Sequence, residues 1–134
     1  MRYTLIVVIG LFMALTPRAS AQFAISPDGK RSATGVVNQI KIEDVVTQKE
    51  LIRINGHSQR VTTLAYTPEG RFLISGSLDK TVKLWDAAVG RLVREIRIDA
   101  AVSSVDSNGK TVTIIDDQKR KREFEIETGR EVKK

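Results

Sequence analysis

The chain repeats one short turn sequence three times, at a period of about 40 residues. The three copies are Ser26-Pro27-Asp28-Gly29-Lys30, Thr67-Pro68-Glu69-Gly70-Arg71 and Asp106-Ser107-Asn108-Gly109-Lys110. Their glycines are 41 and 39 residues apart. In each copy a glycine that can adopt positive φ follows polar residues and precedes a cation, which is typical of a β-hairpin turn. Repetition at this period predicts a fold assembled from similar small units rather than one irregular domain.

A second series of segments keeps the same period. Residues 40–44 match residues 82–86 at a spacing of 42, and residues 122–125 match residues 83–86 at a spacing of 39. Two independent series with nearly one period are hard to obtain by chance. The repeat therefore covers the strands as well as the turns.

Between the turns lie short segments rich in Val, Ile, Thr, Phe and Leu, which favour β-strands. We expect four strands in each unit. In the first unit they are 23–26, 31–37, 39–45 and 50–55, and in the second they are 61–67, 72–77, 82–86 and 92–98. In the third unit they are 102–106, 111–116, 122–127 and a truncated 130–134. Units of this length with four strands are typical of β-propeller blades. The predicted fold class is all-β, with three four-stranded antiparallel blades of an incomplete propeller.

The N-terminal residues have the pattern of a secretory signal peptide. Arg2 precedes an apolar run at residues 5–15, and Ala19-Ser20-Ala21 follows as a small-residue cleavage site. The run is too short to cross a bilayer comfortably, so no stable membrane anchor is expected. We predict cleavage between Ala21 and Gln22 and a secreted or periplasmic mature protein. The predicted domains are a signal peptide at 1–21 and a repeat region at 22–134, with blades at about 22–55, 56–98 and 99–134.

Composition excludes several kinds of site. The chain has one histidine and no cysteine, so a metal site of the usual zinc type is not expected. Phosphate-binding and dinucleotide-binding glycine motifs are absent from the sequence, and we predict no cofactor. The formal net charge is +6, with one basic run at residues 119–122 that we interpret mainly as a solvated turn. Aromatic residues make up 5% of the chain, too few for base stacking, so nucleic acid is not an expected partner.

The second unit resembles the WD40 repeat family. Gly56-His57 is similar to the opening Gly-His signature of that family, Trp85-Asp86 to its closing dipeptide, and residues 73–84 to its central strands. The first and third units match in their turns and strand pattern alone. Glu43 and Phe124 stand at the counterparts of Trp85 in these units.

The resemblance implies a buried hydrogen-bond network in the second unit, formed by His57, Ser75, Asp79 and Trp85. Neutral histidine can pass a hydrogen bond onward while it orients a serine hydroxyl and an indole N–H. A serine, a histidine and an aspartate could also be interpreted as a hydrolase triad. The spacings fit the structural network, and no Gly-x-Ser-x-Gly motif is present, so we predict no catalytic residues.

The resemblance also implies a non-enzymatic scaffold that binds a protein partner across the narrower face of a propeller. The residues that it places on this face are Arg60, Thr62, Leu78, Asp99, Ala101 and Asp117. The alternative is a truncated or accessory part of a larger propeller protein, such as the binding domain of an enzyme. Gene context would distinguish the two, because a neighbouring gene that carries further blades would favour truncation.

Three blades do not close a ring, so the terminal blades would each have one uncovered face. Three explanations stay open: a fragment of a longer protein, a homo-oligomer that completes the propeller, and an open three-blade stack. Because buried apolar area contributes about 25 cal/mol per Å², we expect uncovered blade faces to make the protein associate.

Overall fold

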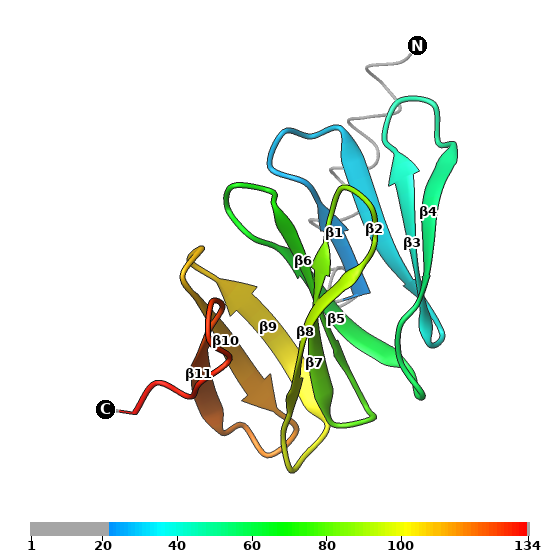
Figure 1. Ribbon diagram of the computed structural model, residues 1–134. Helices are drawn as coiled ribbons and strands as arrows, with labels where there is room; N and C mark the ends of the chain where they lie inside the picture. Colours follow the sequence, from blue (N-terminus) through cyan, green and yellow to red (C-terminus); the bar gives the residue numbers. More distant parts are fainter. Residues whose placement is uncertain (1–21, 134) are drawn as a thin grey trace.

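The computed structural model describes residues 22–133, which form three antiparallel β-sheets (Figure 1). We call these sheets blades 1, 2 and 3. Blade 1 contains β1 (Phe23–Ile25), β2 (Arg31–Val36), β3 (Gln39–Asp44) and β4 (Glu50–Asn55). Blade 2 contains β5 (Val61–Tyr66), β6 (Phe72–Ser77), β7 (Thr81–Asp86) and β8 (Leu92–Arg97). Blade 3 contains β9 (Val102–Ser107), β10 (Thr111–Asp116) and β11 (Lys121–Glu125).

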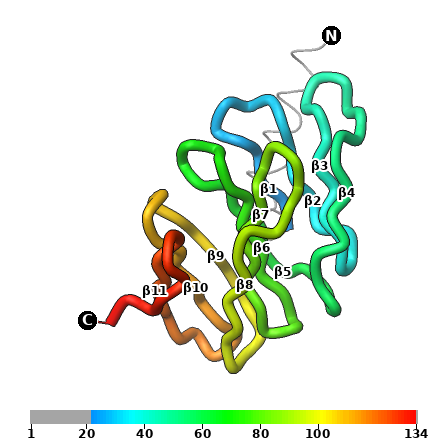
Figure 2. The backbone as a smooth tube through the Cα atoms, in the orientation of Figure 1, coloured from blue at the N-terminus to red at the C-terminus, as the bar shows by residue number. Residues whose placement is uncertain are grey.

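Each blade is a simple up-and-down sheet in which neighbours in sequence pair with each other. The three blades lie side by side as an open fan (Figures 1 and 2). Their first strands run along one side of the fan, where β1 lies beside β5 and β5 lies beside β9. The all-β architecture of propeller blades is therefore confirmed. The predicted signal peptide and the residue Ala21 lie outside the described residues.

Blade 3 differs from the prediction because the part of it that the structure describes has three strands instead of four. After β11 the chain turns at Gly129 and returns beside β11, where one isolated bridge joins Phe124 to Glu131. The backbone N–H of Val132 also donates to the carbonyl of Glu123 at 2.8 Å. The predicted fourth strand is thus reduced to a short returning segment.

The three repeated turns have the backbone geometry that their sequences predict. Gly29, Gly70 and Gly109 have φ values of 74°, 75° and 95°. An L-residue with a side chain is disfavoured in this region, which explains the glycine at each turn. The Asp28 and Asn108 side chains accept hydrogen bonds from the backbone N–H two residues later, as expected for such turns.

Apolar side chains form two cores, one on each side of blade 2. The core between blades 1 and 2 includes Ile40, Leu73 and Trp85. The core between blades 2 and 3 includes Leu84 and Phe124. Blade 2 is therefore apolar on both faces, as a sheet covered on both sides should be.

Blades 1 and 3 each turn an apolar face toward blade 2, and their outer faces differ in polarity. On the outer face of blade 1, Lys41 and Glu43 form an ion pair at 3.2 Å, but Ile25 and Val36 also lie there and are 39% and 38% exposed. On the outer face of blade 3 lie Lys121 and Glu123, with their charged groups 3.9 Å apart. The sequence predicts uncovered apolar faces that drive association. Among the described residues, the polar outer face of blade 3 does not fit that expectation, whereas the outer face of blade 1 is partly apolar.

Candidate functional site

The four residues of the expected network come from four parts of the chain and meet inside blade 2. His57 lies in the linker between β4 and β5, Ser75 in β6, Asp79 in the β6–β7 turn and Trp85 in β7. His57 Nε2 lies 2.7 Å from Ser75 Oγ, and His57 Nδ1 lies 2.9 Å from Asp79 Oδ2. The Trp85 indole N–H donates to Ser75 Oγ at 2.8 Å. The structure thus brings all four side chains together.

The hydrogen bonds define the protonation of His57. Burial lowers the pKa of His57 below its ordinary value of 6.5, so its imidazole is neutral at neutral pH and carries one ring proton. An ionised Asp79 can only accept, so that proton is on Nδ1, which donates to Asp79. Nε2 is then an acceptor, and Ser75 Oγ donates to it while accepting from the Trp85 indole N–H.

Thr81, at the start of β7, is a fifth member of the network that sequence reasoning missed. Its hydroxyl donates to Asp79 Oδ1 at 2.6 Å and lies 3.1 Å from His57 Nδ1. Burial alone would raise the pKa of Asp79, but the hydrogen bonds from Thr81 and His57 outweigh it and lower that pKa. Asp79 is therefore a carboxylate at neutral pH and acts as the acceptor of the network.

The same distances would suit a serine hydrolase triad, in which serine donates to histidine and histidine to aspartate. Two observations argue against that use. Ser75 is 0% exposed and His57 is 6% exposed, so no substrate reaches the hydroxyl. The Trp85 indole also occupies one side of the Ser75 oxygen. These hydrogen bonds can hold the linker, the turn and two strands together. The buried Ser75 hydroxyl is not accessible as a nucleophile.

The network stabilises one end of the fan, which we call the turn face. It is formed by the β2–β3, β6–β7 and β10–β11 turns (37–38, 78–80 and 117–120) with the linkers between blades (56–60 and 98–101). The turns and the first linker are joined by backbone hydrogen bonds: the N–H of His57 donates to Asn38 O and that of Leu78 to Arg60 O, both at 3.1 Å. The turn face is therefore one connected surface.

Five of the six residues predicted for partner binding lie on this face. Arg60, Leu78, Asp99 and Asp117 are exposed, and Ala101 is half-buried with its carbonyl bonded to the Asp117 N–H. Thr62 differs. Its hydroxyl donates to Val102 O at 2.6 Å and to Gly76 O at 3.2 Å, so it joins blade 2 to blade 3 instead of facing a partner.

Val37 is a turn-face residue that the sequence analysis did not select. It lies 41 residues before Leu78, in the corresponding turn of blade 1, and 64% of its surface is exposed. Leu78 is 42% exposed. The period of the repeat could have identified Val37, because the same turn position had already been chosen in blades 2 and 3. The turn face thus carries two exposed apolar side chains beside charged ones.

The basic run at 119–122 is mostly paired with carboxylates. Arg120 contacts Asp116 at 2.7 Å and Asp99 at 3.1 Å, and Arg122 contacts Glu131 at 2.9 Å. The hydrogen bond to Asp116 raises the pKa of Arg120. Arg120 therefore stabilises the β10–β11 turn, and Arg122 joins β11 to the segment that returns beside it.

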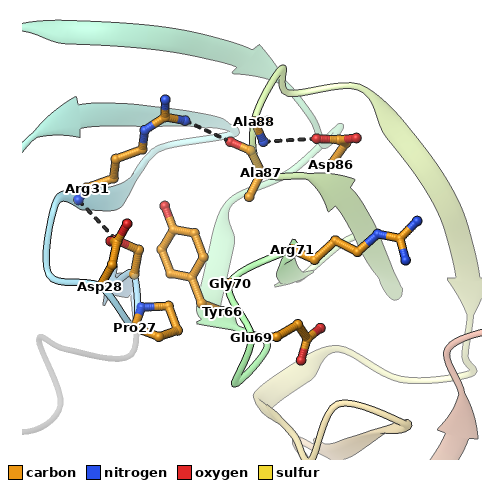
Figure 3. Close-up of a pocket in the computed structure, with 11 residues that line it drawn as sticks. Pro27, Asp28, Arg31, Tyr66, Glu69, Gly70, Arg71, Asp86, Ala87 and Ala88 are labelled. Atoms are coloured by element: carbon orange, nitrogen blue, oxygen red, sulfur yellow. Dashed lines mark hydrogen bonds between the residues drawn. The ribbon is translucent and has the colours of Figure 1, made fainter.

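A pocket of about 380 Å³ opens between blades 1 and 2 at the opposite end of the fan (Figure 3). Its lining includes Asp28, Arg31, Tyr66 and Arg71. Arg31 spans the two blades by donating to the Ala87 carbonyl at 3.2 Å. The Tyr66 hydroxyl is buried and has no hydrogen-bond partner among the described residues, and burial raises its pKa to about 12.

Within residues 22–133, no group of three or more potential metal-ligating side chains lies close together. Nor does that part of the chain contain a helix with the length and apolarity that a membrane span requires.

Part of the chain matches a known repeat family. The WD40 family model, described as WD domain, G-beta repeat, matches residues 48–86, which include β4 and β5–β7. The β-propeller domain of Cps50 (Swd1) from Myceliophteria thermophila has a TM-score of 0.75 and 26% sequence identity. That similarity covers 84% of this chain and 36% of the propeller domain.

Similar curated proteins match over shorter segments. U3 small nucleolar RNA-associated protein 21 of Saccharomyces cerevisiae is 38% identical over 66 residues, which are 49% of this chain and 7% of that protein. The Ribosome biogenesis protein BOP1 homolog of Monosiga brevicollis is 46% identical over 50 residues, which are 37% of this chain and 6% of that protein. The chain thus spans less than a tenth of the length of these relatives.

These relatives correct one prediction. Their names refer to a small nucleolar RNA and to ribosome biogenesis, and neither describes a secreted or periplasmic protein. The secreted or periplasmic localisation predicted from the N-terminal residues is therefore wrong.

Proposed function

We propose that this chain, which contains a match to the WD40 repeat and has blades of the β-propeller kind, is a non-enzymatic scaffold that binds a protein partner through its turn face. The main support is the exposure of Val37 and Leu78 on a surface whose backbone is held by hydrogen bonds. Apolar anchors on a rigid frame with a charged rim are typical of protein-binding sites. Here Arg60, Asp99 and Asp117 supply the rim.

The buried network supports this use of the turn face. Leu78 directly precedes Asp79, whose carboxylate is bonded by His57, Thr81 and the Ser58 N–H. A partner that contacts Leu78 therefore meets a turn that is already ordered, which lowers the entropic cost of binding. The solvent-excluded Ser75 supports the absence of hydrolase activity.

The second candidate is a binding part of a larger propeller protein. It is favoured by the observation that the chain matches 36% of the length of its structural neighbour. The ribosome-biogenesis roles named for the curated relatives belong to proteins of which the matched segment is 6–7%. Our proposal is therefore confined to protein binding.

Comparison of two matched variants tests the proposal. Leu78→Asp places a charge on the turn face, whereas Val89→Asp places one in the β7–β8 turn at the opposite end, where Val89 is 63% exposed. Both variants should keep the urea midpoint of the wild type. Tagged wild-type chain and Val89→Asp should retain the same proteins from an extract of the source cells, and Leu78→Asp should lose them. Equal retention by both variants would contradict the proposal.

A further inference from the structure

The pairing register makes corresponding positions of the blades directly comparable. Gly35 pairs with Ile40 in blade 1, Gly76 with Val82 in blade 2 and Ile115 with Lys121 in blade 3. Spacings of 41 and 39 residues separate the first members of these pairs. Gly35, Gly76 and Ile115 are therefore the same position in three successive blades.

The glycine at this position lets the next blade approach. A Cβ on Gly35 would lie 3.3 Å from the Val61 side chain of blade 2, and a Cβ on Gly76 would overlap Val102 of blade 3. In blade 3 the position is Ile115, a large β-branched residue. A further blade could not pack on blade 3 in the way that blade 3 packs on blade 2.

Neighbouring positions on the same face change in the same direction. Ile74, Val82 and Leu84 of blade 2 are buried beneath blade 3. At their counterparts 39 residues later, blade 3 carries Thr113, Lys121 and Glu123. The face of blade 2 that blade 3 covers is apolar, whereas the corresponding face of blade 3 is polar.

The outer face of blade 1 carries polar residues at two positions where the same face of blade 2 carries apolar ones. Leu73 and Trp85 of blade 2 pack against blade 1, and they pair with each other in the register. The corresponding pair of blade 1 is Ser32 and Glu43. Glu43 thus stands in place of tryptophan on a face that no blade within residues 22–133 covers, and it pairs with Lys41 at 3.2 Å. Ile25 and Val36 are exposed on the same face, so the outer face of blade 1 is only partly polar.

From these substitutions we infer that the outer face of blade 3 is an end face, closed both to a further propeller blade and to a second copy of this chain. Packing a blade onto Lys121 and Glu123 would remove charged groups from water at a high free-energy cost. Terminal units of stacked repeats have polar outer faces for the same reason. On blade 3 a protein partner therefore meets the ends of the strands, where the turn face lies, and not the outer sheet face.

Single cysteines test this inference, because the chain has none of its own. Thr113→Cys reports on the outer face of blade 3, since Thr113 pairs with Glu123. Ala33→Cys is the matched control, because Ala33 is 0% exposed beneath blade 2. The full-length chain is used, and reaction with a disulfide thiol reagent is followed from about 1 to 200 µM protein.

Thr113 is half-buried, so we expect Thr113→Cys to react at a rate that does not depend on protein concentration, and Ala33→Cys to react at least tenfold more slowly. Protection of the thiol at position 113 that increases with concentration would overturn the inference, because another copy would then cover that face. The result is independent of the proposed function. A covered outer face would leave partner binding by Leu78 intact, and failure of the Leu78→Asp comparison would leave the thiol at position 113 reactive.

Discussion

Gly76 of β6 lies directly against the side chain of Val102 in β9, with no space for a side chain on residue 76. A Cβ added there would also lie 2.8 Å from Thr63 Cγ2. This contact sets the distance between blades 2 and 3. It explains why a glycine, normally unfavourable within a strand, occurs in β6.

Gly76→Ala should therefore destabilise the protein by about 1–3 kcal/mol, because the added methyl group forces the two blades apart. Gly35→Ala is the matched comparison. Its nearest neighbour would be Val61 at 3.3 Å, so a small shift relieves the contact and the cost should be clearly smaller. Urea midpoints of the two variants measure the difference. Equal midpoints would argue against close packing at Gly76.

The buried network gives a second prediction. Asp79→Ala leaves the donors on His57, Thr81 and Ser58 without their acceptor and should lower the free energy of unfolding by roughly 1–3 kcal/mol. Asp28→Ala is the control. Because Asp28 is fully exposed in the β1–β2 turn, its replacement should lower the free energy of unfolding much less. If the two variants had the same urea midpoint, the network would contribute nothing to stability.

Local signals in the sequence were sufficient to predict the turns and all the strands except the last strand of blade 3. Gly29, Gly70 and Gly109 need only their own residues to define a turn, and the resemblance of one unit to the WD40 repeat named the four residues of the network. The faces of the sheets were harder, because the pattern along a strand does not say which face another blade covers. Glu43 looked like a departure from the repeat until the register placed it on an outer face.

The sequence was also insufficient to show which way Thr62 of the candidate site faces. Its position in the sequence suggests a partner-binding face, but a bulge in the pairing of β5 with β6 directs its hydroxyl to Val102 of the next blade. The structure alone also reveals the buried Tyr66 hydroxyl. No pattern in one sequence shows whether a tyrosine oxygen has a partner.

Tyr66 and its neighbour Thr67 provide a matched pair for a third prediction. The Tyr66 hydroxyl is buried without a partner, whereas Thr67 Oγ1 accepts the Phe72 N–H at 3.1 Å. Removing an unsatisfied hydroxyl removes a desolvation cost, so Tyr66→Phe should leave stability unchanged or raise it by up to about 1 kcal/mol. Thr67→Val should lower it by about 1 kcal/mol or more. Thermal or urea unfolding measures the stability of both variants. A large loss of stability in Tyr66→Phe would mean that the Tyr66 hydroxyl has a hydrogen-bond partner.

The last prediction concerns pH and rests on His57, the one histidine of the chain. Burial lowers its pKa in the folded protein below the ordinary 6.5, so the unfolded chain binds a proton at a higher pH than the folded chain does. Stability should therefore be constant from about pH 8 to 7 and fall as the pH drops below about 6.5, with a slope of at most about 1.4 kcal/mol per pH unit.

The carboxylates with lowered pKa, Asp79 among them, lose their contribution only at lower pH, below the ordinary value of 3.8 for aspartate. The interval from pH 7 to 5 therefore reports mainly on His57. Urea unfolding across this interval should show a decline for the wild type. His57→Gln should be less stable overall but almost independent of pH over the same interval, because it has no imidazole to protonate. An identical decline in that variant would show that another group is responsible and that His57 is not held neutral by the network.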